Sequence, residues 1–167
     1  VFLARPKRGE RPAPRLVVKR LLPSFRAHSD LGTLEREAEL HRAVQHPNVV
    51  TVFGAGEVNG EPYIAMEYVD GVDVYRLLRR AESEQRAIPP PLAVHIARQV
   101  ADALDSVHSA RDAHGRRLDI VHRDINPSNV YLSVDGAVKV GDFGIARTGA
   151  PSPVSVGSGK GLKGKFG

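Results

Sequence analysis

Short apolar runs separated by polar turns predict strands in the first part of the chain. Residues 1–4 and 16–19 are strand-like, and the Pro- and Arg-rich stretch between them predicts a loop, so we expect an antiparallel hairpin. Two further strands are predicted at 49–53 and 63–68. The Asn-Gly pair at 59–60 predicts the turn that joins them, because both residues readily adopt positive φ.

Apolar residues at helical spacing predict three helices. One covers residues 31–44, a short one covers 74–81, and a longer one opens at the proline run 89–91, where proline is tolerated in the first turn. The long helix carries a core-facing set of apolar positions: Leu92, Ile96, Val100, Ala103, Leu104 and Val107. Two short strands follow at 130–132 and 138–140, around an Asp-Gly turn.

The chain thus begins with strands and one inserted helix and continues with a mainly helical part. This order predicts an α+β fold with two lobes. We place the boundary so that residues 1–69 form the first lobe and residues 70–167 the second. The hydrophobic content of 41% is ordinary for a globular protein, and the absence of Cys excludes disulfides and thiolate metal sites. No apolar run is long enough to span a membrane. Although the net charge is +5, no nucleic-acid-binding module is recognisable, so nucleic acid is not an expected partner.

Two polar motifs carry the candidate chemistry. Residues 122–129 read H-R-D-I-N-P-S-N, and residues 142–144 read D-F-G. Asp124 is a candidate base, while Asn129 and Asp142 supply the hard oxygen ligands that suit Mg²⁺. With these motifs the chain resembles the eukaryotic-like Ser/Thr protein kinases of bacterial type, and other landmarks of that family follow in the same order.

The resemblance implies a set of catalytic roles. Lys19, at the end of the strand L-V-V-K, would hold the α- and β-phosphates of ATP, and Glu37 would pair with it. Asp124 would accept the proton of the substrate hydroxyl, and Asn129 and Asp142 would bind Mg²⁺. His122 would pack under the site.

The resemblance also implies a nucleotide site. Met66 would be the gatekeeper, backbone groups of Glu67 and Val69 would receive the adenine edge, and Val1 and Val17 belong to the same site. Asp73 is equally well interpreted as an acidic ribose contact or as a helix N-cap.

Two departures from the family qualify these roles. Asn126 stands where Ser/Thr kinases usually carry a catalytic Lys, so charge stabilisation of the transition state should be weaker. The Gly-rich loop is also missing before Val1, and the chain stops where A-P-E would follow. We therefore expect a truncated kinase domain that is poorly stable and inactive alone, with apolar faces around Leu104 and Val107 left without partners.

The predicted activity is ATP-dependent phosphoryl transfer to Ser or Thr hydroxyls of protein substrates. The alternative is a pseudokinase, a nucleotide-binding or scaffold module without transfer; a tyrosine kinase is less favoured because residues 126–128 lack the Arg-containing insert of that branch. Arg123 predicts regulation by phosphorylation, with candidate acceptors at Thr148, Ser152, Ser155 and Ser158. The expected location is cytoplasmic, either free or as the cytoplasmic part of a membrane-anchored protein.

Overall fold

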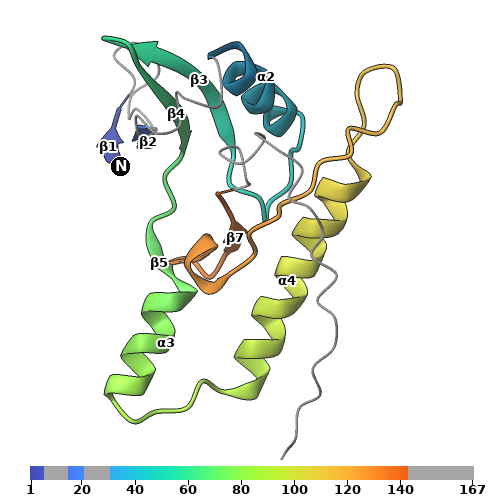
Figure 1. Ribbon diagram of the computed structural model, residues 1–167. Helices are drawn as coiled ribbons and strands as arrows, with labels where there is room; N and C mark the ends of the chain where they lie inside the picture. Colours follow the sequence, from blue (N-terminus) through green and yellow to red (C-terminus); the bar gives the residue numbers. More distant parts are fainter. Residues whose placement is uncertain (6–14, 21–30, 143–167) are drawn as a thin grey trace, which may run out of the picture.

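A four-stranded antiparallel sheet with one helix beside it forms the first part of the fold (Figure 1). The computed structural model describes residues 1–5, 15–20 and 31–142. The elements of this sheet part are β1 (Phe2–Ala4), β2 (Leu16–Arg20), α2 (Leu31–Arg42), β3 (Val52–Val58) and β4 (Glu61–Glu67). The strand order is β1-β2-β4-β3, and α2 packs against β3.

Most of these elements confirm the predictions. Strands β1 and β2 form the expected antiparallel hairpin, with Leu3 opposite Val17. Helix α2 buries Leu34 and Ala38, which are 2% and 1% exposed. Asn59 and Gly60 both have positive φ, as the predicted tight turn between β3 and β4 requires.

The predicted position of the third strand was wrong. We expected it at 49–53, whereas β3 covers Val52–Val58. It contains Gly54 and Gly56, residues that rarely favour strands, and a β-bulge interrupts the pairing between Val52 and Gly54. Val49 instead forms an isolated bridge with Val140, a partner far away in the sequence.

Two helices and a small sheet form the second, helical part. Its elements are β5 (Gly71–Asp73), α3 (Val74–Ser83), α4 (Pro90–Ser109), the 3₁₀ helix η1 (Pro127–Asn129), β6 (Val130–Ser133) and β7 (Val138–Val140). The strand order is β5-β6-β7. Strand β5 was not predicted; it lies so close to β6 that a Cβ at Gly71 would overlap the carbonyl oxygen of Leu132. None of the described helices is long and apolar enough to cross a membrane.

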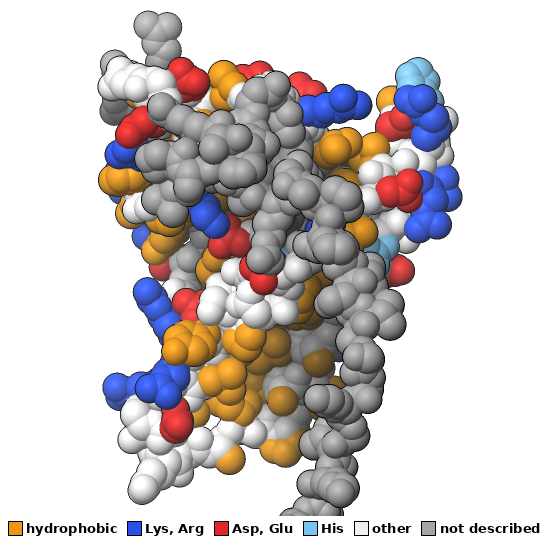
Figure 2. Space-filling view, in the orientation of Figure 1, with side chains coloured by type: hydrophobic (Ala, Val, Ile, Leu, Met, Phe, Trp, Pro, Cys, Tyr) orange, Lys and Arg blue, Asp and Glu red, His pale blue; other side chains and the backbone are white. Residues whose placement is uncertain are grey.

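One hydrophobic core joins the two parts. Buried residues from α2, β3 and β4 continue into Ala103 and Val107 of α4 and Val140 of β7. The expectation that Val107 would lack partners was therefore wrong, because its side chain is 1% exposed. Apolar side chains are exposed elsewhere: α3 buries no residue, and hydrophobic groups gather on the lower half of the face in Figure 2.

Strand β7 is tied to the sheet part by main-chain hydrogen bonds. The Val50 N–H donates to the Val140 carbonyl, and the Val140 N–H donates to the Asn48 carbonyl, both at 2.8 Å. The buried Asn48 side chain also donates to the Val138 carbonyl at 2.8 Å. The end of β7, where Gly141 and Asp142 follow, is therefore fixed relative to both parts of the fold.

Candidate active site

His122 connects the motif at 122–129 to the end of β7. Its ring is 1% exposed, and Nε2 lies 2.9 Å from the Gly141 carbonyl, which can only accept. Nδ1 accepts the Asp124 N–H at 3.3 Å, so the arrangement requires a neutral ring that carries its proton on Nε2. Burial lowers the pKa of His122, which favours this neutral form. The histidine thus packs under the motif as predicted.

The Asp124 carboxylate is held from one side and open on the other. The Asn129 amide donates to the Asp124 carbonyl at 2.9 Å and to Asp124 Oδ2 at 3.2 Å. Asp124 itself is exposed, and Oδ1 has no hydrogen-bond donor among the described residues. An oriented, accessible carboxylate oxygen of this kind can accept a proton from a bound hydroxyl.

Asn126 has a structural role that the sequence did not indicate. Its Oδ1 accepts the Ser128 N–H at 2.9 Å and thereby caps η1, while its Nδ2 donates to the Asp124 carbonyl at 3.2 Å. Both bonds go to main-chain atoms of the motif. The side chain that replaces the usual lysine is therefore used to shape the loop around Asp124.

Lys19 and Asp142 meet across the two parts of the fold. Lys19 Nζ lies 2.6 Å from Asp142 Oδ1, and the side chains are 36% and 26% exposed. Asp142 adopts a φ of 54°, an uncommon backbone conformation for a residue other than glycine. Glu37 lies on α2, but its side chain is outside the described part of the structure, so its pairing with Lys19 stays a prediction.

Tyr131 is a neighbour of Asp142 that sequence analysis missed. Its hydroxyl lies 3.5 Å from Asp142 Oδ2. Burial, the negative charge of Asp142 and that of Asp73 together raise the pKa of Tyr131 to about 12, so the hydroxyl keeps its proton. A tyrosine in a short strand gave no sequence signal for this position.

Asn129 and Asp142 could hold a divalent cation. The Gly141 N–H donates to the Asn129 carbonyl at 2.9 Å, which holds the two segments side by side. Asn129 Oδ1 has no donor in the described part, since its known bonds use Nδ2. No cluster of three or more His, Asp or Glu occurs there. Two oxygen ligands fit a cation that takes its other ligands from phosphate and water, as Mg²⁺ commonly does.

The predicted nucleotide edge runs along β4 and the connection that follows it. Met66 is half-buried and pairs in register with Val17 of β2. Val69 is half-buried in the connection, whereas Val1 is 80% exposed. The Asp73 carboxylate accepts the Arg76 N–H at 2.7 Å, which confirms the helix-cap interpretation for α3.

Two ion pairs hold the connection between β4 and β5, and neither was predicted. Lys139 Nζ of β7 lies 2.9 Å from Glu67 Oε1, and the other carboxylate oxygen accepts the Thr51 N–H at 3.1 Å. Arg15, just before β2, lies 2.5 Å from Asp70 Oδ2 and 4.6 Å from the centre of the Tyr68 ring. The connection is thus held to the strands on both of its sides.

Arg123 is available to bind an anion. It is exposed, has a φ of 63°, and makes no ion pair within the described residues. Its proposed phosphate acceptors, Thr148, Ser152, Ser155 and Ser158, lie outside the described part, as do Phe143 and Gly144.

Comparison with known proteins points to one family. The protein kinase domain matches residues 9–159. The chain is 37% identical over 148 residues to "Tyrosine-protein kinase MasK" of Myxococcus xanthus, covering 88% of this chain and 23% of that protein. It is 42% identical over 125 residues to "Serine/threonine-protein kinase PknB" of Mycolicibacterium smegmatis, covering 72% and 18%. The PknI kinase domain of Mycobacterium tuberculosis matches with a TM-score of 0.64 and 34% identity, over 79% of this chain and 50% of that one. The chain therefore spans less than a quarter of these curated relatives.

Proposed function

This chain belongs to the protein kinase family, and from that premise we propose that it carries the nucleotide and phosphoryl-transfer site of an ATP-dependent kinase that modifies Ser or Thr hydroxyls of proteins. The observation that supports this most is the 2.6 Å contact between Lys19 and Asp142, 123 positions apart in the sequence. It joins a cation suited to phosphates to the segment that carries a metal ligand. We also propose that the lobes divide at residues 69 and 70.

The proposed residues have separate roles in an in-line displacement at the γ-phosphorus of ATP. The substrate hydroxyl oxygen forms a bond to the γ-phosphorus, and the bond from that phosphorus to the bridging oxygen of the β-phosphate breaks, which releases ADP. Asp124 orients the hydroxyl and accepts its proton, with the carboxylate held by Asn129. Lys19 binds the α- and β-phosphates. When bound at Asn129 and Asp142, Mg²⁺ would offset the negative charge of the phosphates.

The nucleotide would lie along the connection after β4. Backbone groups of Glu67 and Val69 would receive the adenine edge, while Met66 and Val17 would contact it from the adjoining strands. The Glu67 carboxylate is occupied by Lys139 and Thr51, so only its backbone is assigned to adenine. Asp73 caps α3 with Oδ1, and its Oδ2 lies 3.4 Å from Arg76 Nε, so a ribose hydroxyl would share this oxygen with Arg76.

The hydroxyl acceptor is proposed as Ser or Thr because several relatives are named serine/threonine-protein kinases, among them PknE and PknB. The name of MasK gives tyrosine as the second candidate. Phosphoamino-acid analysis of the labelled product separates the two. Phosphotyrosine as the main product would overturn the acceptor while leaving the phosphoryl-transfer site intact.

Because the chain alone is expected to be inactive, transfer is tested in the full-length protein, with radiolabelled ATP and a general protein substrate. We expect Asp124→Asn to reduce the transfer rate at least about a hundredfold, because the proton acceptor is lost. Asp105→Asn is the matched control, since Asp105 is an exposed carboxylate on α4 and makes no described ion pair. Nucleotide binding without any transfer by the unmodified protein would instead support the pseudokinase alternative. We further propose a cytoplasmic site of action, where ATP is available.

A further inference from the structure

Tyr131 of β6 lies directly beside Asp142, one of the two proposed metal ligands. Its hydroxyl oxygen is 3.5 Å from Asp142 Oδ2, and the other carboxylate oxygen, Oδ1, lies 2.6 Å from Lys19 Nζ. Because an ionised carboxylate only accepts hydrogen bonds, the tyrosine hydroxyl is the donor. Asp142 is thus held from two sides, by Lys19 of the sheet part and by Tyr131 of the helical part.

The neighbours of Tyr131 set the position of its ring. Tyr131 pairs in register with Asp73 of β5 and with Lys139 of β7, so these three side chains project from the same face of the small sheet. The ring also lies against Gly141, where a Cβ atom would come within 2.9 Å of ring atom Cε2. A side chain at position 141 would therefore push the ring away from Asp142.

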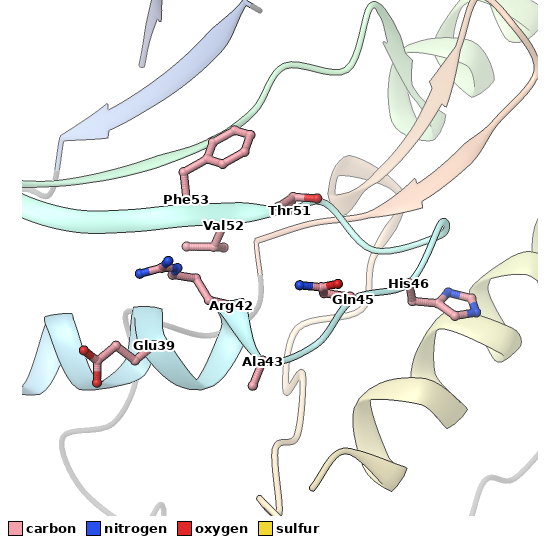
Figure 3. A pocket seen from close by; sticks show the side chains of 8 residues that line it. All are labelled: Glu39, Arg42, Ala43, Gln45, His46, Thr51, Val52 and Phe53. Carbon is pink, nitrogen blue, oxygen red and sulfur yellow. The ribbon is translucent and has the colours of Figure 1, made fainter. Parts of the chain in front are cut away.

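The same face of the small sheet is attached to the sheet part through Lys139. Its Nζ lies 2.9 Å from Glu67 Oε1, and Glu67 Oε2 accepts the N–H of Thr51 at 3.1 Å. Figure 3 shows Thr51 where the chain enters β3. The open pocket in that view has no residue of β5, β6 or β7 in its lining. The face that carries Tyr131 is therefore a separate feature, and contacts to neighbouring segments hold it in place.

The hydroxyl distinguishes Tyr131 from a residue that only packs. A phenylalanine ring would fill the same space against Gly141, but it could not donate to Asp142. At 3.5 Å the contact is long for a hydrogen bond, so its effect is to orient the carboxylate rather than to bind it tightly. Each carboxylate oxygen keeps a second lone pair, so both can still accept a cation. Hydrogen bonds of this kind to a metal ligand orient the ligand and raise metal affinity.

We propose that Tyr131 is a positioning residue for a divalent cation, because its hydroxyl holds Asp142 Oδ2 and keeps the carboxylate oriented for metal binding. This inference rests on the proposed function, since it requires that Asn129 and Asp142 bind the metal that accompanies ATP. It goes beyond that function by assigning part of the metal affinity to a residue outside the motifs at 122–129 and 142–144.

The test measures metal affinity in the full-length protein with a non-hydrolysable ATP analogue bound. Mn²⁺ replaces Mg²⁺ as the probe, and its binding is followed by electron paramagnetic resonance, which requires no phosphoryl transfer. We expect Tyr131→Phe to weaken Mn²⁺ binding about fivefold, which corresponds to the loss of one hydrogen bond. Affinity for the analogue without metal should not change, because the ring is retained.

Transfer assays give a second, independent measurement. In Tyr131→Phe the Mg²⁺ concentration that gives half of the maximal rate should rise by the same factor, while kcat at saturating Mg²⁺ stays within about twofold. A tyrosine that only supported the fold would not separate these two quantities. A lower kcat with an unchanged Mg²⁺ requirement would therefore overturn the proposal.

Tyr63→Phe is the matched control. Tyr63 is a half-buried strand tyrosine beside a glycine, Gly56, and its hydroxyl makes no hydrogen bond to another residue in the described part of the chain. Its substitution should leave Mn²⁺ affinity unchanged. Equal affinity in Tyr131→Phe and the unmodified protein, or equal losses in both variants, would overturn the role of Tyr131 alone. Absence of Mn²⁺ binding by the unmodified protein would overturn the metal site, and this inference with it.

Discussion

The ion pair between Lys139 and Glu67 should stabilise the fold measurably, because it joins β7 to the connection after β4. The Nζ–Oε1 distance is 2.9 Å, and the side chains are only 18% and 27% exposed. At an effective dielectric constant of about 20, Coulomb's law gives a gross attraction of about 6 kcal/mol. Desolvation of both groups and the ordering of the lysine side chain oppose most of it. We therefore expect a net coupling of about 1–2 kcal/mol.

The coupling is measured with a double-mutant cycle of Lys139→Gln, Glu67→Gln and the double variant in urea unfolding. The pair Arg79–Glu82 on α3 is the matched control, because its distance is 2.6 Å but its side chains are 64% and 71% exposed. Solvent screening should reduce that coupling to about 0.5 kcal/mol or less. If the two cycles give the same coupling, the partial burial of the Lys139 pair does not strengthen it, and the reasoning fails.

Two further predictions concern the loop that carries Asp124 and the pH dependence set by His41 of α2 and by His122. Asn126→Lys should raise kcat about tenfold or more, because it adds a cation where negative charge develops in the transition state. It should also lower the free energy of unfolding by about 1 kcal/mol, because the η1 cap is lost. Steady-state kinetics measures the change in kcat and thermal unfolding the change in stability, and an unchanged kcat would contradict the predicted role of the charge. The pKa of His41 is lowered by burial and by the nearby His122 to about 4, and burial lowers the pKa of His122 as well. Below the unfolded-state value of 6.5 the unfolded chain binds more protons, so the His41 contribution to stability should fall as pH drops from 6.5 toward 4, by up to about 1.4 kcal/mol per pH unit. The lowered pKa of His122 acts in the same direction. Urea midpoints across this range test it, and a flat profile, or an unaltered one in His41→Asn, would count against it.

The sequence predicted those elements whose signal is local. The hairpin of β1 and β2, helix α2 and the strands β6 and β7 follow from apolar spacing and turn residues close to them. Strand β3 was misplaced because its pairing with β4 tolerates a bulge and two glycines, and strand β5 was missed because it exists only through its contact with β6. Pairing between distant segments supplies the free energy in both cases, and a single sequence does not record it.

The candidate site also contains some residues that the sequence pointed to and others that only the folded structure shows. Asp124, Asn129 and Asp142 were selected from the sequence because phosphoryl transfer needs those side-chain types at that spacing, and their roles stay proposals. Tyr131, Lys139 and Arg15 were not, since each matters through one distant partner. A lysine in a strand or an arginine before one is usually a solvated charge, and only the folded chain shows otherwise.

Main-chain partners explain why Asn126 could be identified as a departure but not understood from the sequence. The side chains of His122 and Asn129 form hydrogen bonds to the main-chain carbonyls of Gly141 and Asp124. The side chain of Asn126 accepts a hydrogen bond from the main-chain N–H of Ser128. Every residue except proline offers the same main-chain groups, so no pattern of side chains reveals which of them will be used. The asparagine removes a charge from the site but adds a cap that fixes the loop bearing Asp124. The Asn126→Lys variant therefore gains a positive charge and loses the cap that shapes the loop. Comparing its effect on kcat with its effect on stability shows whether this site depends more on the charge or on the loop geometry.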